Sequence, residues 1–230
     1  MPVKNRFSEL LSEITKWRRD IHENPELLFD THRTSSFVEE RLKEFGCDDV
    51  ITGIGRTGVI GVIKGQTNKS GKVIGLRADM DALPIFEATG LDYKSKTPGI
   101  MHACGHDGHM TMLLGAAKYL NETKNFSGKV ALIFQPSEED GGGGKVMCEE
   151  GIMNTFSINQ VYGLHNAPGL PLGFFKTNHG PNMAAADDFT IEIRGKGGHG
   201  ANPEETFDPI TASVSYTHLR AHETPEHLVC

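Results

Sequence analysis

Residues 129–140 read KVALIFQPSEED, and this stretch decides the fold. Its first seven residues form a largely apolar run of strand length, which is typical of a strand buried inside an α/β sheet. A proline, two adjacent glutamates and four glycines follow closely, so the strand ends in a flexible turn that carries Glu138 and Glu139. Active sites of α/β proteins form at such strand ends.

The glutamate pair allows two interpretations. Adjacent side chains leave an extended segment in opposite directions, so one carboxylate can bind a metal ion while its neighbour faces a substrate. The alternative is an exposed acidic turn. On the glutamate pair alone, this alternative is favoured.

The segments on either side predict further strands and helices. Apolar strand patterns occupy residues 57–64, 72–78 and 161–164. Apolar residues at helical spacing mark 7–17, 34–45 and 110–120, and a further helix is predicted over 145–150. The order β, β, α, β, α, β indicates an α/β domain with its chemistry at strand ends.

The pattern changes from about residue 177. Residues 188–194 (DFTIEIR) alternate apolar and polar side chains, as in a strand with one solvent-facing side. The loop GKGGHGANP follows, and a helix is predicted to open at residues 209–213. This part is expected to begin a second, smaller domain.

Composition narrows the class of protein. The 230 residues carry a net charge of -7 with a pI near 5.9, which argues against a nucleic-acid or anionic-membrane partner. No apolar run approaches the roughly 18 residues of a membrane span, and the N-terminus lacks the apolar core of a signal peptide. The expected location is the cytoplasm. Four widely spaced cysteines do not suggest a disulfide framework.

The densest chemical signal is MHACGHDGH, residues 101–109. Cys104 stands two residues before His106, with His102 and His109 on either side. Thiolate and imidazole are ligands that divalent zinc, manganese and cobalt accept. A Cys-x-His pair on a loop just before a helix presents two donors to one small volume. A polar loop of hydrogen-bonded histidines is the alternative.

Other strand ends carry further candidates. His165 follows the short strand in VYGLHNAP, and Asp79 and Asp81 follow the strand in RADMDALP. A structural histidine and turn aspartates are the alternatives for each alone. Parallel strand ends converge on one edge of a sheet, so together the clusters predict one site. Its ligands would be Cys104, His106, Glu139 and His165, with Glu138 as general base.

These segments resemble one enzyme family. WRRDIHENPEL, LRADMDALPI, MHACGHDGHMTMLLGAA, ALIFQPSEEDGGGG, VYGLHNAPGLPLG and GKGGHGANP, in this order, are similar to the M20 peptidase-like amidohydrolases. The most similar subgroup contains hippurate hydrolase, N-acyl-amino-acid amidohydrolases and auxin-conjugate hydrolases.

The resemblance implies a site with two divalent metal ions, zinc, manganese or cobalt. It implies Cys104, His106, Glu139 and His165 as ligands and Glu138 as the base. Asp79 stands where the wider family has a histidine, so the resemblance implies that Asp79 supports the site and does not bind metal directly. Asp81 is also expected to support the site, and we count it among the catalytic residues. His199 matches a histidine that helps to polarise the substrate carbonyl in related dimers, and a homodimer is possible.

The predicted fold is therefore an α/β, mixed-sheet metallohydrolase catalytic domain at residues 1–176. Residues 177–213 begin an α+β satellite domain for the lid or dimer contact, and 214–230 resemble a spurious ending. The sequence is expected to be a truncated member of the family that lacks a further His ligand. His218, His222 and His227 are not expected to be ligands, because HETPEH has the wrong spacing for HExxH and contains a proline.

The predicted reaction is hydrolysis of the amide bond of a small-molecule N-acyl amino acid. The alternatives are an M20 dipeptidase, an N-acetyldiaminopimelate deacetylase, or an inactive metal-binding remnant.

Overall fold

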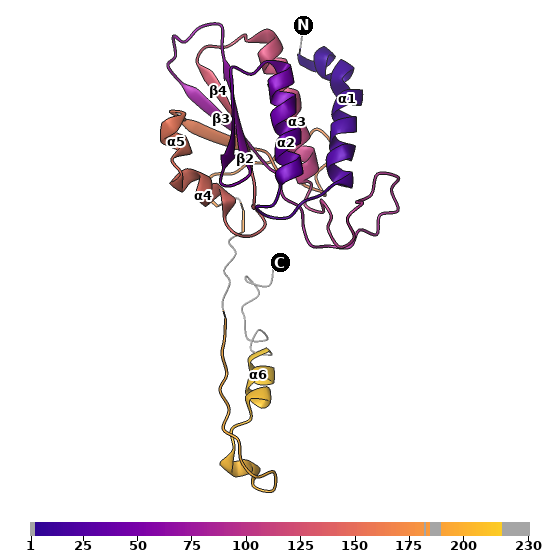
Figure 1. The fold of residues 1–230 in the computed structure, drawn as a ribbon, viewed down its shortest axis with the longest axis vertical. Helices are drawn as coiled ribbons and strands as arrows, with labels where there is room; N and C mark the ends of the chain where they lie inside the picture. The colour runs from indigo at the N-terminus through magenta and orange to yellow at the C-terminus, as the bar shows by residue number, and fades with distance from the viewer. Residues whose placement is uncertain (1–2, 182, 185–189, 218–230) are drawn as a thin grey trace. The chain divides into compact units, whose positions relative to one another are not determined.

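The computed structural model describes residues 3–181, 183–184 and 190–217. The chain divides into two compact units, Met1–Leu170 and Pro171–Cys230. The first unit is a β-sheet with helices on both faces (Figure 1).

The sheet has five strands in the order β1-β2-β4-β3-β5. They are listed in chain order as β1 Asp49–Ile54, β2 Gly58–Lys64, β3 Val73–Asp79, β4 Lys129–Gln135 and β5 Gln160–Gly163. β3 pairs in parallel with both β4 and β5, whereas β2 runs antiparallel to β1 and β4. The predicted α/β fold with a mixed sheet is confirmed, and the parallel strands bring their carboxyl ends to one edge.

Two hydrophobic cores lie on opposite faces of the sheet because successive side chains of a strand alternate. Val130, Leu132 and Phe134 of β4 pack toward α1 (Val3–Glu23), α2 (His32–Phe45) and α3 (His106–Thr123). Ala131 and Ile133 pack toward α4 (Gly143–Glu149) and α5 (Ile152–Thr155). Burial on both faces explains why β4 is apolar along its length.

The structure differs from the sequence prediction in three elements, which are β1, α5 and α3. β1 was not predicted, and α5 was not either. β2 and β3 are joined by a polar turn but are not neighbours, because β4 lies between them. α3 begins at His106 rather than near residue 110, so His106 and His109 lie on the helix and not on the loop before it.

The second unit contains the short helix η1 (Pro203–Glu205) and α6 (Pro209–Thr217), which confirms the helix predicted to open at residue 209. The strand predicted over 188–194 is not formed at residues 190–194, because no described segment pairs with them. Residues 188 and 189 lie outside the described residues, as do His218, His222 and His227. Among the described helices none is long and apolar enough to cross a membrane.

Candidate metal centre

Four segments bring metal-ligand side chains together beside the carboxyl ends of the parallel strands. Three overlapping groups have ligand atoms within 4.8 Å of one another: Cys104, His106 and His165; His106, Glu138 and Glu139; Asp79, His106 and His109. His106 belongs to all three groups and is therefore the centre of the cluster.

The His106 ring is completely buried and oriented. Its Nδ1 lies 2.8 Å from the main-chain oxygen of Asp81, which accepts the hydrogen bond. A neutral ring then carries its proton on Nδ1, and Nε2 presents a lone pair. Nε2 is buried without a hydrogen-bond partner among the described residues and lies 3.6 Å from Glu139 Oε1. This is the arrangement of a metal-ligating histidine whose other nitrogen is fixed by the protein.

Asp81 orients the two glutamates. Its Oδ1 accepts a hydrogen bond from the backbone N–H of Glu138 at 3.0 Å, and its Oδ2 accepts one from the backbone N–H of Glu139 at 3.1 Å. The same residue holds His106, so a single buried aspartate connects the end of β3 with the turn after β4 and with α3.

The glutamate turn is strained at Ser137, whose φ is +54° although it is not a glycine. Its hydroxyl donates to the main-chain oxygen of Asp140, which closes the turn. Non-glycine residues with positive φ are costly and concentrate at functional sites. Opposite directions were predicted for the two side chains, but Glu138 Oε2 and Glu139 Oε1 lie 3.8 and 3.6 Å from the same atom, His106 Nε2. The side chains differ in exposure, at 36% for Glu138 and 19% for Glu139.

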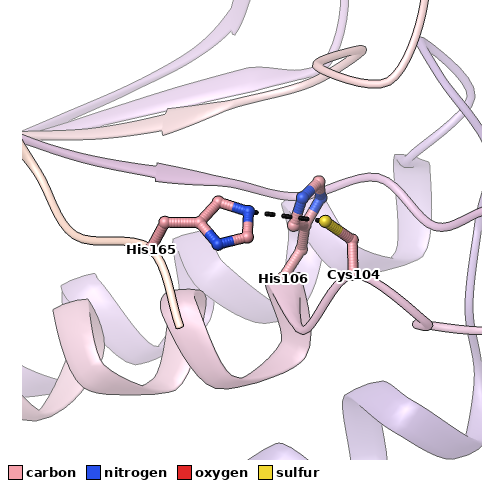
Figure 2. Close-up of side chains that lie close together, drawn as sticks. All are labelled: Cys104, His106 and His165. Carbon is pink, nitrogen blue, oxygen red and sulfur yellow. Dashed lines mark hydrogen bonds between the residues drawn. The ribbon is translucent and has the colours of Figure 1, made fainter. Parts of the chain in front are cut away.

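Cys104 and His165 complete the cluster from the other side. Figure 2 shows the His165 ring pointing toward Cys104 with His106 beside it, and the distance from Cys104 Sγ to His165 Nε2 is 3.4 Å. Cys104 precedes α3, whereas His165 follows β5, so the two meet only because β5 pairs with β3.

Burial and neighbouring carboxylates shift the pKa values of the side chains in the cluster. Burial, together with the carboxylate of Glu139, raises the pKa of the Cys104 thiol to about 12. Burial likewise raises the pKa of Glu139. Burial opposes the charge on His106, but the contact with Asp81 and the charge of Asp79 outweigh it, so the pKa of His106 is raised. Without a cation, the Cys104 thiol therefore keeps its proton.

The comparisons with known proteins identify the family. Residues 75–227, which are 153 of the 230, match the model of Peptidase family M20/M25/M40. The chain belongs to the M20 peptidase family.

Two curated M20 relatives illustrate the similarity. The chain is 49% identical to thermostable carboxypeptidase 2 of Saccharolobus solfataricus, over 92% of this chain and 54% of that protein. It is 51% identical to the hippurate hydrolase of Campylobacter jejuni, over 89% of this chain and 52% of that protein. The chain spans about half the length of the curated relatives it matches.

A solved M20 structure supports the fold. A Bacillus subtilis protein described as a dinuclear metal binding peptidase matches with a TM-score of 0.68 and 39% identity. The match covers 72% of this chain and 46% of that one.

Two residues beside the M20 cluster, His109 and Asn166, were not proposed as site residues from the sequence. His109 lies three positions after His106 on α3, and residues three apart share a helix face. This signal becomes visible only once the helix is known to begin at His106. Asn166, which contacts His109, carries no signal of its own.

His199 belongs to the second unit of this M20 chain. Its Nδ1 accepts a hydrogen bond from the backbone N–H of Ala201 at 3.2 Å. A neutral His199 ring therefore carries its proton on Nε2, where it can donate.

A buried ion pair ties α1 to the start of α3. His22 Nδ1 lies 2.8 Å from Asp107 Oδ2, and His22 Nε2 lies 3.2 Å from Glu87 Oε1. Both nitrogens must be protonated to donate to two carboxylates. The hydrogen bond with Asp107 raises the pKa of His22. Burial opposes ionisation of Asp107, but the bond from His22 outweighs it, so the pKa of Asp107 is lowered.

We expect His22→Gln to lower the free energy of unfolding by about 1 to 3 kcal/mol near pH 5 in the metal-free chain. The contribution of His22 is complete below the ordinary pKa of 6.5 and is lost as the pH rises through the raised pKa. The contribution of Asp107 is present above 3.8 and is lost as the pH falls through the lowered pKa. Urea unfolding across the pH range measures the difference, and a difference that does not vary with pH would contradict this account.

A second prediction concerns Gly105, directly before α3. Its φ is +92°, and an added Cβ would lie 2.4 Å from Asn166 Oδ1. We expect Gly105→Ala to cost about 1 to 2 kcal/mol from the backbone alone, and also to weaken Co²⁺ binding by displacing the loop after β5. Gly108→Ala is the matched control, because nothing lies within 4 Å of its added Cβ. Equal effects of the two substitutions on Co²⁺ titrations would argue against this.

Proposed function

We propose that this chain carries the metal-binding, catalytic part of an enzyme that hydrolyses the amide bond of N-acyl amino acids. The observation that supports it best is His106 Nε2, buried and unpartnered within the described part of the chain, beside Glu139. A buried polar atom without a partner is costly, and a bound cation removes that cost.

We propose Cys104, His106, Glu139 and His165 as ligands of two divalent ions, with zinc, manganese or cobalt equally compatible. Their donor atoms suit these metals, and Glu139 Oε1, like His106 Nε2, is buried without a hydrogen-bond partner among the described residues. Bound ions would supply Lewis acidity and a more acidic water. Uptake would also displace the protons that burial keeps on Cys104, so binding should weaken as the pH falls.

Glu138 is proposed as the general base. Its side chain is the more exposed of the pair, and its Oε2 lies 3.8 Å from His106 Nε2, beside the proposed ligands. Asp81 fixes the backbone of Glu138, so the side chain starts from a defined position and can still turn toward a substrate. Glu138 would accept a proton from the attacking water and return it to the leaving amine.

His199 is proposed to donate a hydrogen bond from Nε2 to the substrate carbonyl oxygen, where charge develops during attack. Its neighbouring backbone keeps Nδ1 as an acceptor. A homodimer remains part of the proposal, as do a catalytic domain at residues 1–176 and a satellite domain beginning at 177.

The test uses the longest natural protein that contains this sequence. After chelation it is reloaded with Zn²⁺, Mn²⁺ or Co²⁺ and assayed for amine release from hippurate, a dipeptide and N-acetyldiaminopimelate. We expect metal-dependent turnover with hippurate preferred. Preference for the dipeptide favours a peptidase, consistent with the carboxypeptidase relative. Metal binding without turnover on any substrate identifies an inactive metal-binding protein.

A further inference from the structure

His109 is buried and lies beside the proposed ligands without being needed as one. Its ring is 3% exposed, and its Nδ1 lies 2.7 Å from Asp79 Oδ1. The other oxygen of this carboxylate, Oδ2, pairs with Arg77 at 2.9 Å, so Asp79 serves as an acceptor on both sides. Nδ1 of His109 therefore donates to Asp79, and a neutral ring offers Nε2 as an acceptor.

Asn166 engages that second nitrogen. The backbone N–H of Asn166 donates to His109 Nε2 at 3.0 Å. Asn166 Oδ1 lies 2.5 Å from the same atom, and turning the amide by 180° places its Nδ2 there as a second donor to Nε2. Asp79, His109 and Asn166 thus form a continuous chain from the end of β3, through the first turn of α3, to the loop after β5.

His165 depends on this chain for its place. Its side chain is exposed, and among the described residues its Nδ1 is hydrogen-bonded only to the main-chain oxygen of Asn166. The ring stacks edge-on against His109 with the centroids 4.5 Å apart. Its Nε2 lies 3.4 Å from Cys104 Sγ, toward which the ring points (Figure 2). The loop itself forms no strand beyond Gly163, so sheet pairing does not hold it.

We infer that His109 is a positioning residue. Asp79 anchors its ring, its Nε2 accepts the hydrogen bond from Asn166, and the loop held in this way places the His165 imidazole beside Cys104. This inference rests on the proposed metal site. Asp79, His106 and His109 also satisfy the spacing of a cation site. That use is disfavoured, because both nitrogens of His109 are engaged and Asp79 Oδ2 already pairs with Arg77 at 2.9 Å.

The inference predicts an interaction between two substitutions. Co²⁺ is the probe, and its affinity and visible spectrum are measured in the 230-residue chain with His109→Ala, His165→Ala and the double variant. We expect each single variant to weaken Co²⁺ binding by about 10- to 100-fold, the usual effect of losing a residue that orients a ligand. The double variant should be no weaker than His165→Ala, because His109 acts through His165. At saturating Co²⁺, His109→Ala should give the spectrum of His165→Ala.

Three outcomes overturn the inference. Equal weakening by His109→Ala in both backgrounds means that His109 acts independently of His165. An unchanged Co²⁺ affinity in His109→Ala, with His165→Ala weakened, removes the inference and leaves the proposed site intact. No effect of His165→Ala removes the ligand assignment and the inference together.

Two further variants guard against simple misfolding. Asn166→Ala leaves His109 and Asp79 in place. It removes the contact of the Asn166 side chain with His109 but keeps the backbone hydrogen bond, so it should weaken Co²⁺ binding less than His109→Ala does. His32→Ala alters an exposed histidine and should change nothing. If His109→Ala does not fold by circular dichroism, Asn166→Ala in the two His165 backgrounds gives the same comparison, and additive effects there overturn the inference.

Discussion

Glu138→Gln is expected to lower kcat for hippurate by about 10²- to 10⁴-fold, the range that general-base catalysis contributes. Glutamine has nearly the same shape but cannot accept a proton from water at neutral pH. Asp81 holds residue 138 through its backbone, so the turn should persist in the variant. Metal content by mass spectrometry should stay unchanged, since Glu138 is not among the proposed ligands.

Glu149→Gln is the matched control for this substitution. Glu149 lies on α4, is 66% exposed and pairs only loosely with Lys145 at 3.8 Å, so kcat should not change. The base assignment is wrong if Glu138→Gln keeps kcat intact with metal bound. A loss of metal together with kcat would instead place Glu138 among the ligands.

Asp81→Ala should produce the largest loss of stability. The substitution removes the acceptor of two charge-assisted backbone hydrogen bonds, to Glu138 and Glu139, and such bonds contribute about 1.5 to 3 kcal/mol each. We expect a loss of about 3 kcal/mol or more, a large share of the roughly 5 to 15 kcal/mol that stabilises a typical domain. Urea denaturation of the metal-free chain measures it.

The metal should amplify the effect of Asp81→Ala. The Asp81 side chain holds the backbone N–H of Glu139 and lies 3.5 Å from His106 Nδ1, so the variant should bind Co²⁺ weakly and gain less stability from it than the native chain. Asp92→Ala, an exposed aspartate, serves as control and should change neither quantity. If Asp81→Ala gained as much stability from Co²⁺ as the native chain, Asp81 would not orient the ligands.

The strands of the sheet could be predicted where burial on both faces requires apolar residues along the strand. β4 is apolar throughout because both of its faces are covered, and residues 57–64 and 72–78 carry similar runs. β1 escaped prediction because it is a partly exposed edge strand, DVITGI, with a glycine at positive φ that interrupts its register. The position of β4 between β2 and β3 could not be predicted, since strand order depends on packing between distant segments.

The candidate site follows the same division. Cys104, His106, Glu139 and His165 were proposed from residue type and from their place near strand ends, and the structure brings them together. The residues that hold them were harder to find. The role of Asp81 depends on its two carboxylate oxygens facing two consecutive backbone N–H groups, and no sequence pattern encodes that geometry. Asn166 is an ordinary polar loop residue until β5 docks beside β3.

The pairing of β3 with β5 also has a kinetic consequence. It joins Ile74 to Gln160, the widest separation in sequence between paired strands of the described sheet. Contacts between distant segments close slowly, because the chain loses more entropy before it gains the contact. The imidazole of His165 should therefore arrive last during refolding, after the hairpin of β1 and β2 has formed. The rate at which a refolding chain acquires its final Co²⁺ spectrum would then report the docking of a single edge strand.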